Sequence, residues 1–310
     1  MPQFGRSFNL LAAGKDDAGF LPAVTNLSVY GSIAGTLPSL SPLIKKYLYS
    51  TTLFSPSIIG KLTWERVQDR LALMSSKEEV AARQDMLAGF MKSKYPGTEI
   101  PVEPPEVVAL ASSVISAGSD TTAIALDAFF YYILTNNSVY DRVQREVDAA
   151  YDAGVLRDGE PVRYAQGVKL EYLLACVKES MRLITPFVMD MLRVVPQGGL
   201  TAGKWFLPAG TEVGTNSYAF HRNKAAFGED AEHFRPERWI GLSAEERGAL
   251  ERNFMSVSHS LLSSLYVSLI LGRQFGGGSR ACIASVSSTE ITYCSSLILI
   301  MHNYRGATYR

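Results

Sequence analysis

The sequence predicts a mostly α-helical fold with one small β element. Apolar residues recur at helical spacing in several segments, a long apolar segment from Glu106 to Leu134 contains no proline, and strand-like runs are confined to residues 191–215. The chain has 310 residues, of which 47% are apolar and 19% charged. This composition excludes a disordered or collagen-like chain.

Helices are expected along most of the chain. Residues 1–60 mix short apolar clusters with Gly, Pro and Ser, which predicts short helices and loops. Apolar side chains at helical spacing predict a helix over Thr63–Met74, and Lys92–Pro105 is a linker that leads into a typical helix start. Further helices are predicted at Ser138–Tyr151, at Tyr164–Leu183 and after Cys282.

The β element is expected in three short strands between Gly and Pro turns. They are predicted at Met191–Val195, Lys204–Leu207 and Thr211–Thr215. The polar segment Ala219–Phe254 contains a proline and several aromatic residues, and it is predicted to be an ordered loop.

The segment Glu106–Leu134 is apolar almost all round, so we expect this helix to cross the middle of the core. Gly118 and Asp120 interrupt it, although a helical glycine costs about 1 kcal/mol and a buried aspartate costs more unless it is paired. The pair Asp120-Thr121 is suited to relaying protons or holding a water molecule. The alternative is that Thr121 bonds back to a helix carbonyl while Asp120 faces solvent, but the apolar surroundings favour function.

Charge and cysteine content narrow the functional classes. Lys and Arg number 30 and Asp and Glu also number 30, so no overall positive charge is available to bind nucleic acid. Three cysteines cannot build a disulfide framework, which favours a reducing compartment. The start has no signal-peptide pattern, and the apolar run Leu261–Leu271 is about half the length of a membrane span, so we expect neither an export signal nor an anchor.

Cys282 lies in the glycine-rich segment Phe275–Ala284. Glycines allow backbone amides to approach a bound group, and the N-terminus of the following helix favours a thiolate over a thiol. The segment thus suits a nucleophile or a metal ligand, with Arg280 available to neutralise an anionic group. A buried free cysteine after a glycine turn fits the spacing equally well.

Glu179 and Arg182 are three residues apart and share one face of a predicted helix. Arg238, in the segment Phe234–Trp239, could clamp Glu179 from another direction. From spacing alone, an ordinary surface pair worth well under 1 kcal/mol is the favoured alternative. The four histidines are too far apart for zinc-like spacing, and no G-x-S-x-G motif is present.

Taken in order, these segments resemble the cytochrome P450 family of heme-thiolate monooxygenases. Ala117–Thr122 is similar to the oxygen-activating motif, Glu179–Arg182 matches Glu-x-x-Arg, Phe234–Trp239 matches the Pro-Glu-Arg-Phe/Trp loop, and Phe275–Ala284 is similar to the cysteine loop. The resemblance runs from about Val102 to His302. Arg193–Pro196 and Phe234–Ile240 are similar to fungal members of the pisatin-demethylase type.

The resemblance implies a bound heme b (iron protoporphyrin IX). Cys282 would be its proximal iron ligand, because an axial thiolate supplies electron density that favours O–O cleavage. Arg193 and Arg280 would pair with the heme propionates, and Phe275 and Gly278 would belong to the loop that holds the cofactor.

The resemblance also implies roles in the central helix and beside it. Asp120 and Thr121 would deliver protons to bound dioxygen, with Gly118 opening the helix for that oxygen. Three further residues would form a buried charge cluster that fixes the fold: Glu179, Arg182 and Arg238.

The implied reaction inserts one oxygen atom from O2 into a small apolar organic substrate, with electrons from NADPH through an NADPH-cytochrome reductase. Full-length relatives of this type would lie on the cytosolic face of the endoplasmic reticulum membrane, whereas a chain without an anchor would be cytoplasmic. The alternative is a non-catalytic, degenerate remnant that binds no heme.

Compared with the family pattern, we expect residues 1–310 to form a single partial cytochrome P450 domain with impaired activity. The resemblance implies a longer N-terminal part and a C-terminal β hairpin beyond this chain. Ala284 replaces the family's last glycine in the cysteine loop. Val257–Gln274 adds 18 residues directly before that loop. Val-Ser can be encoded by GTAAGT and Gln by CAG, which are favoured splice sites, so this segment is interpreted as a retained intron, with a genuine loop insertion as the alternative.

Overall fold

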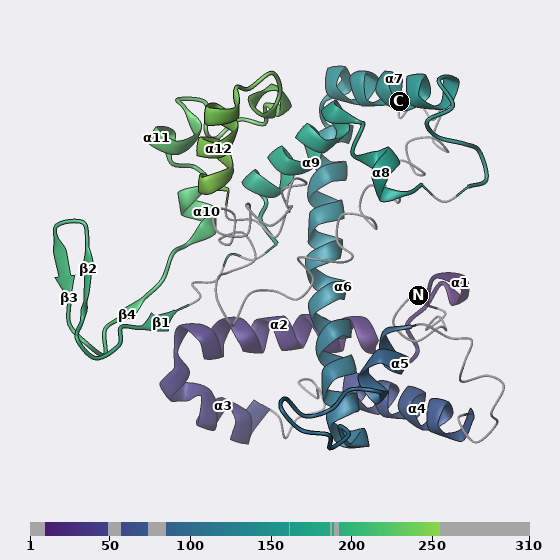
Figure 1. Cartoon of the computed structure of the whole chain (residues 1–310), viewed down its shortest axis with the longest axis vertical. Helices are drawn as coiled ribbons and strands as arrows, with labels where there is room; N and C mark the ends of the chain where they lie inside the picture. The colour runs from purple at the N-terminus through teal and green to yellow at the C-terminus, as the bar shows by residue number, and fades with distance from the viewer. Residues whose placement is uncertain are drawn as a thin grey trace. The chain divides into compact units, whose positions relative to one another are not determined.

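The structure is a computed structural model that describes residues 10–48, 57–73, 85–160, 162–186, 188 and 192–254. The chain divides into two compact units, Met1–Asp120 and Thr121–Arg310, and each is described by itself. The long helix α6 (Pro104–Leu134) contributes to both units (Figure 1). The described part is mostly helical with small antiparallel β elements, as the sequence predicts.

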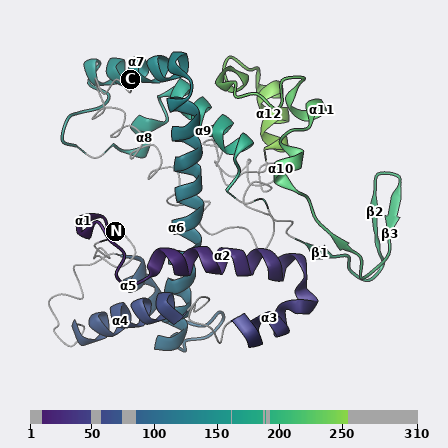
Figure 2. The ribbon, with the colours of Figure 1, turned by 180° about the vertical axis from the view of Figure 1, so that it is seen from behind.

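The first unit is built from helices around one apolar core. Asp16 accepts hydrogen bonds from the backbone N–H groups of Phe20 at 2.9 Å and Leu21 at 2.7 Å, and so caps the start of α2. In this unit α2 crosses α6 steeply (Figure 2). The described elements before α6 are α1 (Leu10–Ala13), α2 (Phe20–Thr36), η1 (Pro38–Leu40), α3 (Ser41–Leu48), α4 (Ser57–Leu73) and α5 (Met86–Met91).

Helix α2 is longer than the short helices expected before residue 60. Its Gly, Pro and Ser residues predict loops, but several Ser and Thr hydroxyls of this helix bond back to carbonyls four residues earlier. Thr25, Ser32 and Thr36 make such bonds at 3.1, 2.9 and 2.8 Å. A hydroxyl satisfied by its own helix does not interrupt that helix. The predicted helix Thr63–Met74 is confirmed and begins earlier, as α4.

The second unit packs its helices around a separate core. The buried side chains include Phe129, Ile133, Val143, Val147 and Leu173, from α6, α7 and α9. The described helices after α6 are α7 (Asn137–Asp152), α8 (Tyr164–Gly167), α9 (Glu171–Leu183), α10 (Ser217–Phe220), α11 (Lys224–Phe227), η3 (Pro236–Trp239) and α12 (Ala244–Asn253).

The predicted helix Tyr164–Leu183 is two helices, α8 and α9, with a break between them. Glu146, on α7, accepts the backbone N–H groups of Tyr172 and Leu173, both at 2.8 Å. A carboxylate at this position satisfies donors that are otherwise orphaned at a helix start. The break is therefore set by a contact from another helix, which the local sequence does not reveal.

The prediction that Ala219–Phe254 is a loop is wrong in part, because α11, η3 and α12 lie within it. Helix α12 starts with a capping box in which the Ser243 side chain accepts the Glu246 N–H and the Glu246 side chain accepts the Ser243 N–H. The Ser-x-x-Glu pattern that signals this helix is present in the sequence.

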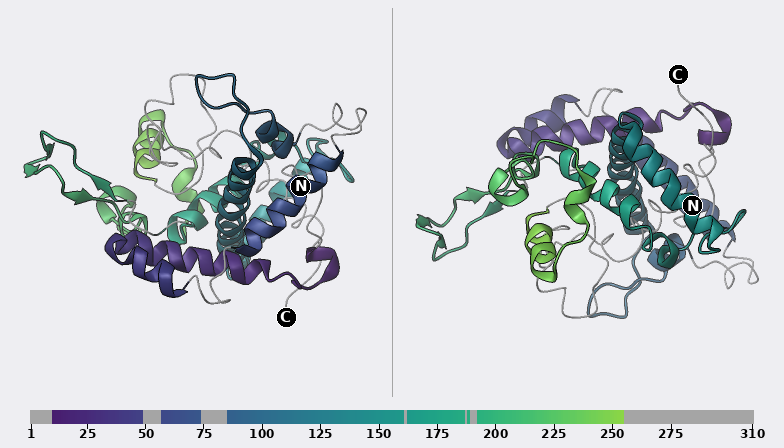
Figure 3. Two further views of the ribbon diagram at one scale, coloured as in Figure 1. Left: turned by 90° about the horizontal axis from the view of Figure 1, so that it is seen from below. Right: turned by 90° about the horizontal axis from the view of Figure 1, so that it is seen from above.

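The β element consists of two separate antiparallel pairs in the described residues. Strand β1 (Arg193–Val194) pairs with β4 (Glu212–Val213), and β2 (Leu200–Ala202) pairs with β3 (Trp205–Leu207). The β2–β3 hairpin projects away from α10–α12 in both views of Figure 3. Gly199 leaves room for the Phe206 ring of this hairpin, since a Cβ at residue 199 would lie 2.4 Å from the Phe206 Cζ atom.

The described residues bury one stripe of α6 and not its whole circumference, which corrects the expectation for this helix. The stripe contains Val107, Ala111 and Ile115 in the first unit and Ala125, Phe129 and Ile133 in the second. Residues 107 and 125 are about five helical turns apart, so they lie on the same face. By length and composition α6 could also cross a membrane, a test that core helices of soluble proteins pass as well.

Candidate functional site

The Glu179–Arg182 pair is fully buried on α9, with both side chains 0% exposed. Its geometry is bidentate: Arg182 Nε donates to Glu179 Oε2 at 2.9 Å, and Nη2 donates to Oε1 at 2.8 Å. The alternative of an ordinary surface pair is therefore wrong. A buried bidentate pair has the geometry in which charge-assisted bonds are strongest.

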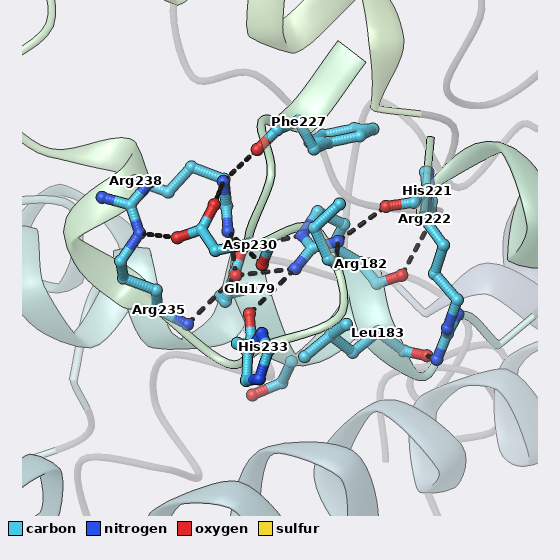
Figure 4. Close-up of polar contacts among 12 residues, drawn as sticks. Glu179, Arg182, Leu183, His221, Arg222, Phe227, Asp230, His233, Arg235 and Arg238 are labelled. Carbon is cyan, nitrogen blue, oxygen red and sulfur yellow. Dashed lines mark hydrogen bonds and ion pairs between the residues drawn. The ribbon is translucent and has the colours of Figure 1, made fainter. Parts of the chain in front are cut away.

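Arg182 makes five hydrogen bonds, which matches the number of N–H donors on a guanidinium. Besides the two to Glu179, Nη1 donates to the carbonyls of His221 at 2.6 Å and Ala231 at 2.5 Å. Nη2 donates to the His233 carbonyl at 3.2 Å. Figure 4 shows these bonds converging on Arg182. One side chain on α9 thus ties down the segment 221–233.

Arg238 approaches Glu179 from η3, so the structure brings together Glu179, Arg182 and Arg238, here called the charge cluster. Arg238 Nε lies 3.3 Å from Glu179 Oε1. The same guanidinium donates to the Asp230 side chain at 2.8 Å and backbone carbonyl at 3.0 Å, and it also contacts the Phe227 carbonyl. The three charges are desolvated, and buried charges are tolerated only when they are paired and hydrogen-bonded.

Two further donors complete the environment of Glu179. The backbone N–H of Arg235 donates to Oε1 at 3.1 Å, and the indole N–H of Trp239 donates to Oε2 at 2.8 Å. Oε1 therefore accepts three hydrogen bonds and Oε2 accepts two. Trp239 is buried, with 8% of its surface exposed, and the aromatic residue of the Pro-Glu-Arg-Trp segment supplies a donor that phenylalanine could not.

Asp230 is a member of this site that sequence reasoning missed. The charge cluster contains two arginines and one carboxylate, so it has one surplus positive charge, and Asp230 pairs with Arg238 and Arg235. Partial desolvation raises the pKa of Asp230, but the bonds from these two arginines outweigh it and leave the pKa below its usual value. No motif in the sequence marks Asp230, because its role depends on the fold of the loop.

His221 is a second residue that the sequence left without a role. Its ring is 0% exposed, its Nδ1 lies 3.0 Å from the Arg182 carbonyl, and it stacks on Phe254 with ring centroids 5.5 Å apart. Because a carbonyl only accepts, Nδ1 carries the proton. Burial lowers the pKa of His221 to about 4, and the charges of Arg182 and Arg222 act in the same direction. The imidazole is therefore neutral near pH 7.

Asp120 lies in the middle of α6 and is bonded to α2. The Ser28 hydroxyl donates to Asp120 Oδ2 at 2.7 Å, and both residues are half-buried. The alternative in which Asp120 turns toward solvent therefore does not hold. Thr121 follows on the same helix and is half-buried, and α6 continues as a helix through Gly118.

The predicted cofactor residues lie mostly outside the described part of the chain. Arg193 is exposed on β1, where its guanidinium donates to the Leu192 carbonyl at 2.9 Å. The remaining predicted positions and the added segment fall outside the described residues: Phe275, Gly278, Arg280, Cys282 and Val257–Gln274.

The chemistry of the described residues fits a heme with one thiolate ligand from elsewhere in the chain. Cys176 is fully buried, and desolvation, followed by the nearby Glu146 carboxylate, raises the pKa of its thiol. A protonated thiol is not a metal ligand. The described residues also contain no group of three or more His, Cys, Asp or Glu side chains that could hold a metal ion. Cys176 is therefore a poor candidate for the iron ligand, and the expected ligand, Cys282, lies outside the described residues.

The helical fold and the charge cluster agree with the expected class of protein, and the chain belongs to the cytochrome P450 family. Residues 4–299 match the family model described as Cytochrome P450. The match begins well before Val102, where the resemblance is expected to begin, because short motifs mark only the part of the fold that carries them.

Curated fungal relatives support the same assignment. The chain is 32% identical over 300 residues to Cytochrome P450 monooxygenase cicH of Emericella nidulans, an alignment that covers 96% of this chain and 56% of cicH. It is 32% identical over 296 residues to Pisatin demethylase of Fusarium vanettenii, covering 93% and 51%. Cytochrome P450 monooxygenase ACRTS1 of Alternaria alternata is 32% identical over 301 residues, covering 94% and 72%.

A crystal structure of a cytochrome P450 (CYP102L1) has the same fold, with a TM-score of 0.67 at 24% identity. The alignment covers 97% of this chain and 58% of that chain. The chain thus spans about half the length of several relatives that it matches.

Proposed function

We propose that this chain is the heme-binding part of a monooxygenase that inserts one oxygen atom from O2 into a small apolar organic substrate. The observation that carries the proposal is the charge cluster, in which Arg182 engages Glu179 and three backbone carbonyls of the segment that leads to Arg238. In the family pattern, this segment precedes the cysteine loop. Such a cluster fixes the scaffold on which a cofactor loop must be held.

Cys282 would hold the heme iron as its axial thiolate. When bound, the heme supplies the site at which O2 is activated, and the thiolate favours O–O cleavage. Arg193 and Arg280 would pair with the heme propionates, with Phe275 and Gly278 shaping the loop around the thiolate. The raised pKa of the buried Cys176 thiol supports Cys282 over Cys176 as the ligand.

Asp120 and Thr121 would move protons toward the oxygen site. A carboxylate and a hydroxyl on adjacent residues of α6 can hold a water molecule and pass a proton along it. Gly118, two residues before Asp120, would leave space for oxygen beside the helix because it has no side chain.

The proposed partners follow from the reaction. Cytochrome P450 monooxygenases need a redox partner, and for a fungal member we propose an NADPH-cytochrome reductase. Eukaryotic members of the family are typically membrane-associated, so we propose the cytosolic face of the endoplasmic reticulum for the whole protein. The charge balance of the chain supports no nucleic-acid partner.

The reduced protein's carbon monoxide difference spectrum tests the proposal. We expect a Soret band at the position typical of a thiolate ligand, which is lost in Cys282→Ala and retained in Cys176→Ala. Absence of heme uptake in the protein, both with and without residues 257–274, would favour the alternative of a non-catalytic remnant. Uptake only after deletion of residues 257–274 would assign the defect to that segment.

A further inference from the structure

The contact between Ser28 and Asp120 links α2 to the middle of α6 within the first unit. The Ser28 hydroxyl lies 2.7 Å from Asp120 Oδ2, although 92 positions separate the two residues in sequence. Among the described residues, Ser28 supplies the one hydrogen bond to this carboxylate, and no described Lys or Arg forms an ion pair with it.

Ser28 differs from the other Ser and Thr hydroxyls of α2. Thr25, Ser32 and Thr36 each donate to the carbonyl four residues earlier on their own helix. That local bond is the usual choice of a helical hydroxyl. Ser28 instead donates across to Asp120, where the acceptor can be ionised and the bond is then stronger than a neutral one. The direction of this side chain is thus set by the carboxylate.

From this geometry we propose that Ser28 is a positioning residue for Asp120, an inference that rests on the proposed function. The carboxylate of an aspartate rotates broadly about its last torsion unless a partner holds it. The Ser28 bond fixes Oδ2 toward α2 and leaves Oδ1 available for a water molecule. Proton transfer depends on such placement, and a displacement of about 1 Å can cost 100-fold in rate.

The first test measures the contact without the cofactor. The unfolding equilibrium of the full chain is measured in urea for Ser28→Ala, Asp120→Asn and the double variant. We expect the effects to be non-additive by about tenfold in the equilibrium constant, which is typical of a hydrogen bond to a charged group. Additive effects would contradict a hydrogen bond between Ser28 and Asp120.

The second test measures positioning in the heme-loaded protein. One readout is the fraction of consumed NADPH whose electrons end in hydrogen peroxide. The other readout is the solvent deuterium isotope effect. In Ser28→Ala both should rise severalfold, and Ser28→Thr, which keeps the hydroxyl, should restore them. Ser32→Ala is the matched control because it removes a half-buried hydroxyl of the same helix that bonds only to the Ser28 carbonyl.

Equal behaviour of Ser28→Ala and Ser32→Ala would overturn the proposal, even if both lower the rate. A protein that takes up no heme would overturn the proposed function and the role of Ser28 with it. The urea experiment would in that case still show whether the contact exists, so the two failures are distinguishable.

Discussion

Replacing Arg182 by lysine separates the positive charge of this side chain from its five hydrogen-bond donors. Lysine keeps the positive charge but has three donors in place of five. Arg182 makes five hydrogen bonds in a site where it is 0% exposed. At least two of the five hydrogen bonds are therefore lost. If charge alone held the site, the substitution would be tolerated.

The expected cost follows from the lost bonds. A hydrogen bond to a charged group contributes about 1.5–3 kcal/mol, so two of them give a loss of about 3–6 kcal/mol in the free energy of unfolding. This is a large part of the roughly 5–15 kcal/mol that a folded domain has in total. Trp239→Phe is a milder variant, because it removes one of several donors to Glu179 and should cost about 1–2 kcal/mol.

Urea unfolding followed by far-ultraviolet circular dichroism measures both losses. The matched control is Arg157→Lys, since Arg157 is 69% exposed in its pair with Glu160 and the change should stay within about 0.5 kcal/mol. The argument is that the five donors of Arg182, and not its charge, hold the cluster. A loss below about 1 kcal/mol for Arg182→Lys, or a loss equal to that of the control, would refute it.

Three other outcomes are expected. The pKa of His221 falls from 6.5 to about 4 on folding, so the folded state binds a proton less readily than the unfolded state. The free energy of unfolding should therefore decrease by about 3 kcal/mol as the pH drops from above 6.5 to below 4. An equally steep decrease in His221→Gln would contradict this. Gly199→Ala should disorder the hairpin in hydrogen exchange through its clash with Phe206, whereas Gly203→Ala, at positive φ but in open space, should show only backbone strain. Sequencing of the mature transcript should find messages without the codons for residues 257–274, and their presence in every message would exclude the intron hypothesis.

The positions of helices could be predicted where the signal is local. The proline-free apolar run and its Pro-Pro-Glu start predict the range of α6, and the amphipathic pattern predicts α7. The break between α8 and α9 could not, because Glu146 of another helix sets it. The missed helix α12 has a local signal, the capping box at Ser243, so that error lies in the interpretation and not in the sequence.

Some residues of the candidate site could be predicted from the sequence and others could not. Glu179, Arg182 and Arg238 follow from motifs whose order resembles a known family. Asp230 and Ser28 carry no motif, because their contacts with Arg238, Arg235 and Asp120 form only in the folded chain. The spacing of Glu179 and Arg182 fits both a surface pair and a buried pair. Their burial in the folded chain decides for the buried pair.

By itself, the sequence determined the helical class, the balanced charge and the order of the motifs, because these depend on residue types and on spacing along one chain. The tertiary structure alone decided which donors reach Glu179, where the surplus charge of the arginines is neutralised and why His221 stays neutral. The bonds that join α9 to the segment 221–239 link residues that are 39 to 60 positions apart, as in the Arg182–His221 and Glu179–Trp239 bonds. Desolvation gives such contacts their strength, and only the packed chain removes the water.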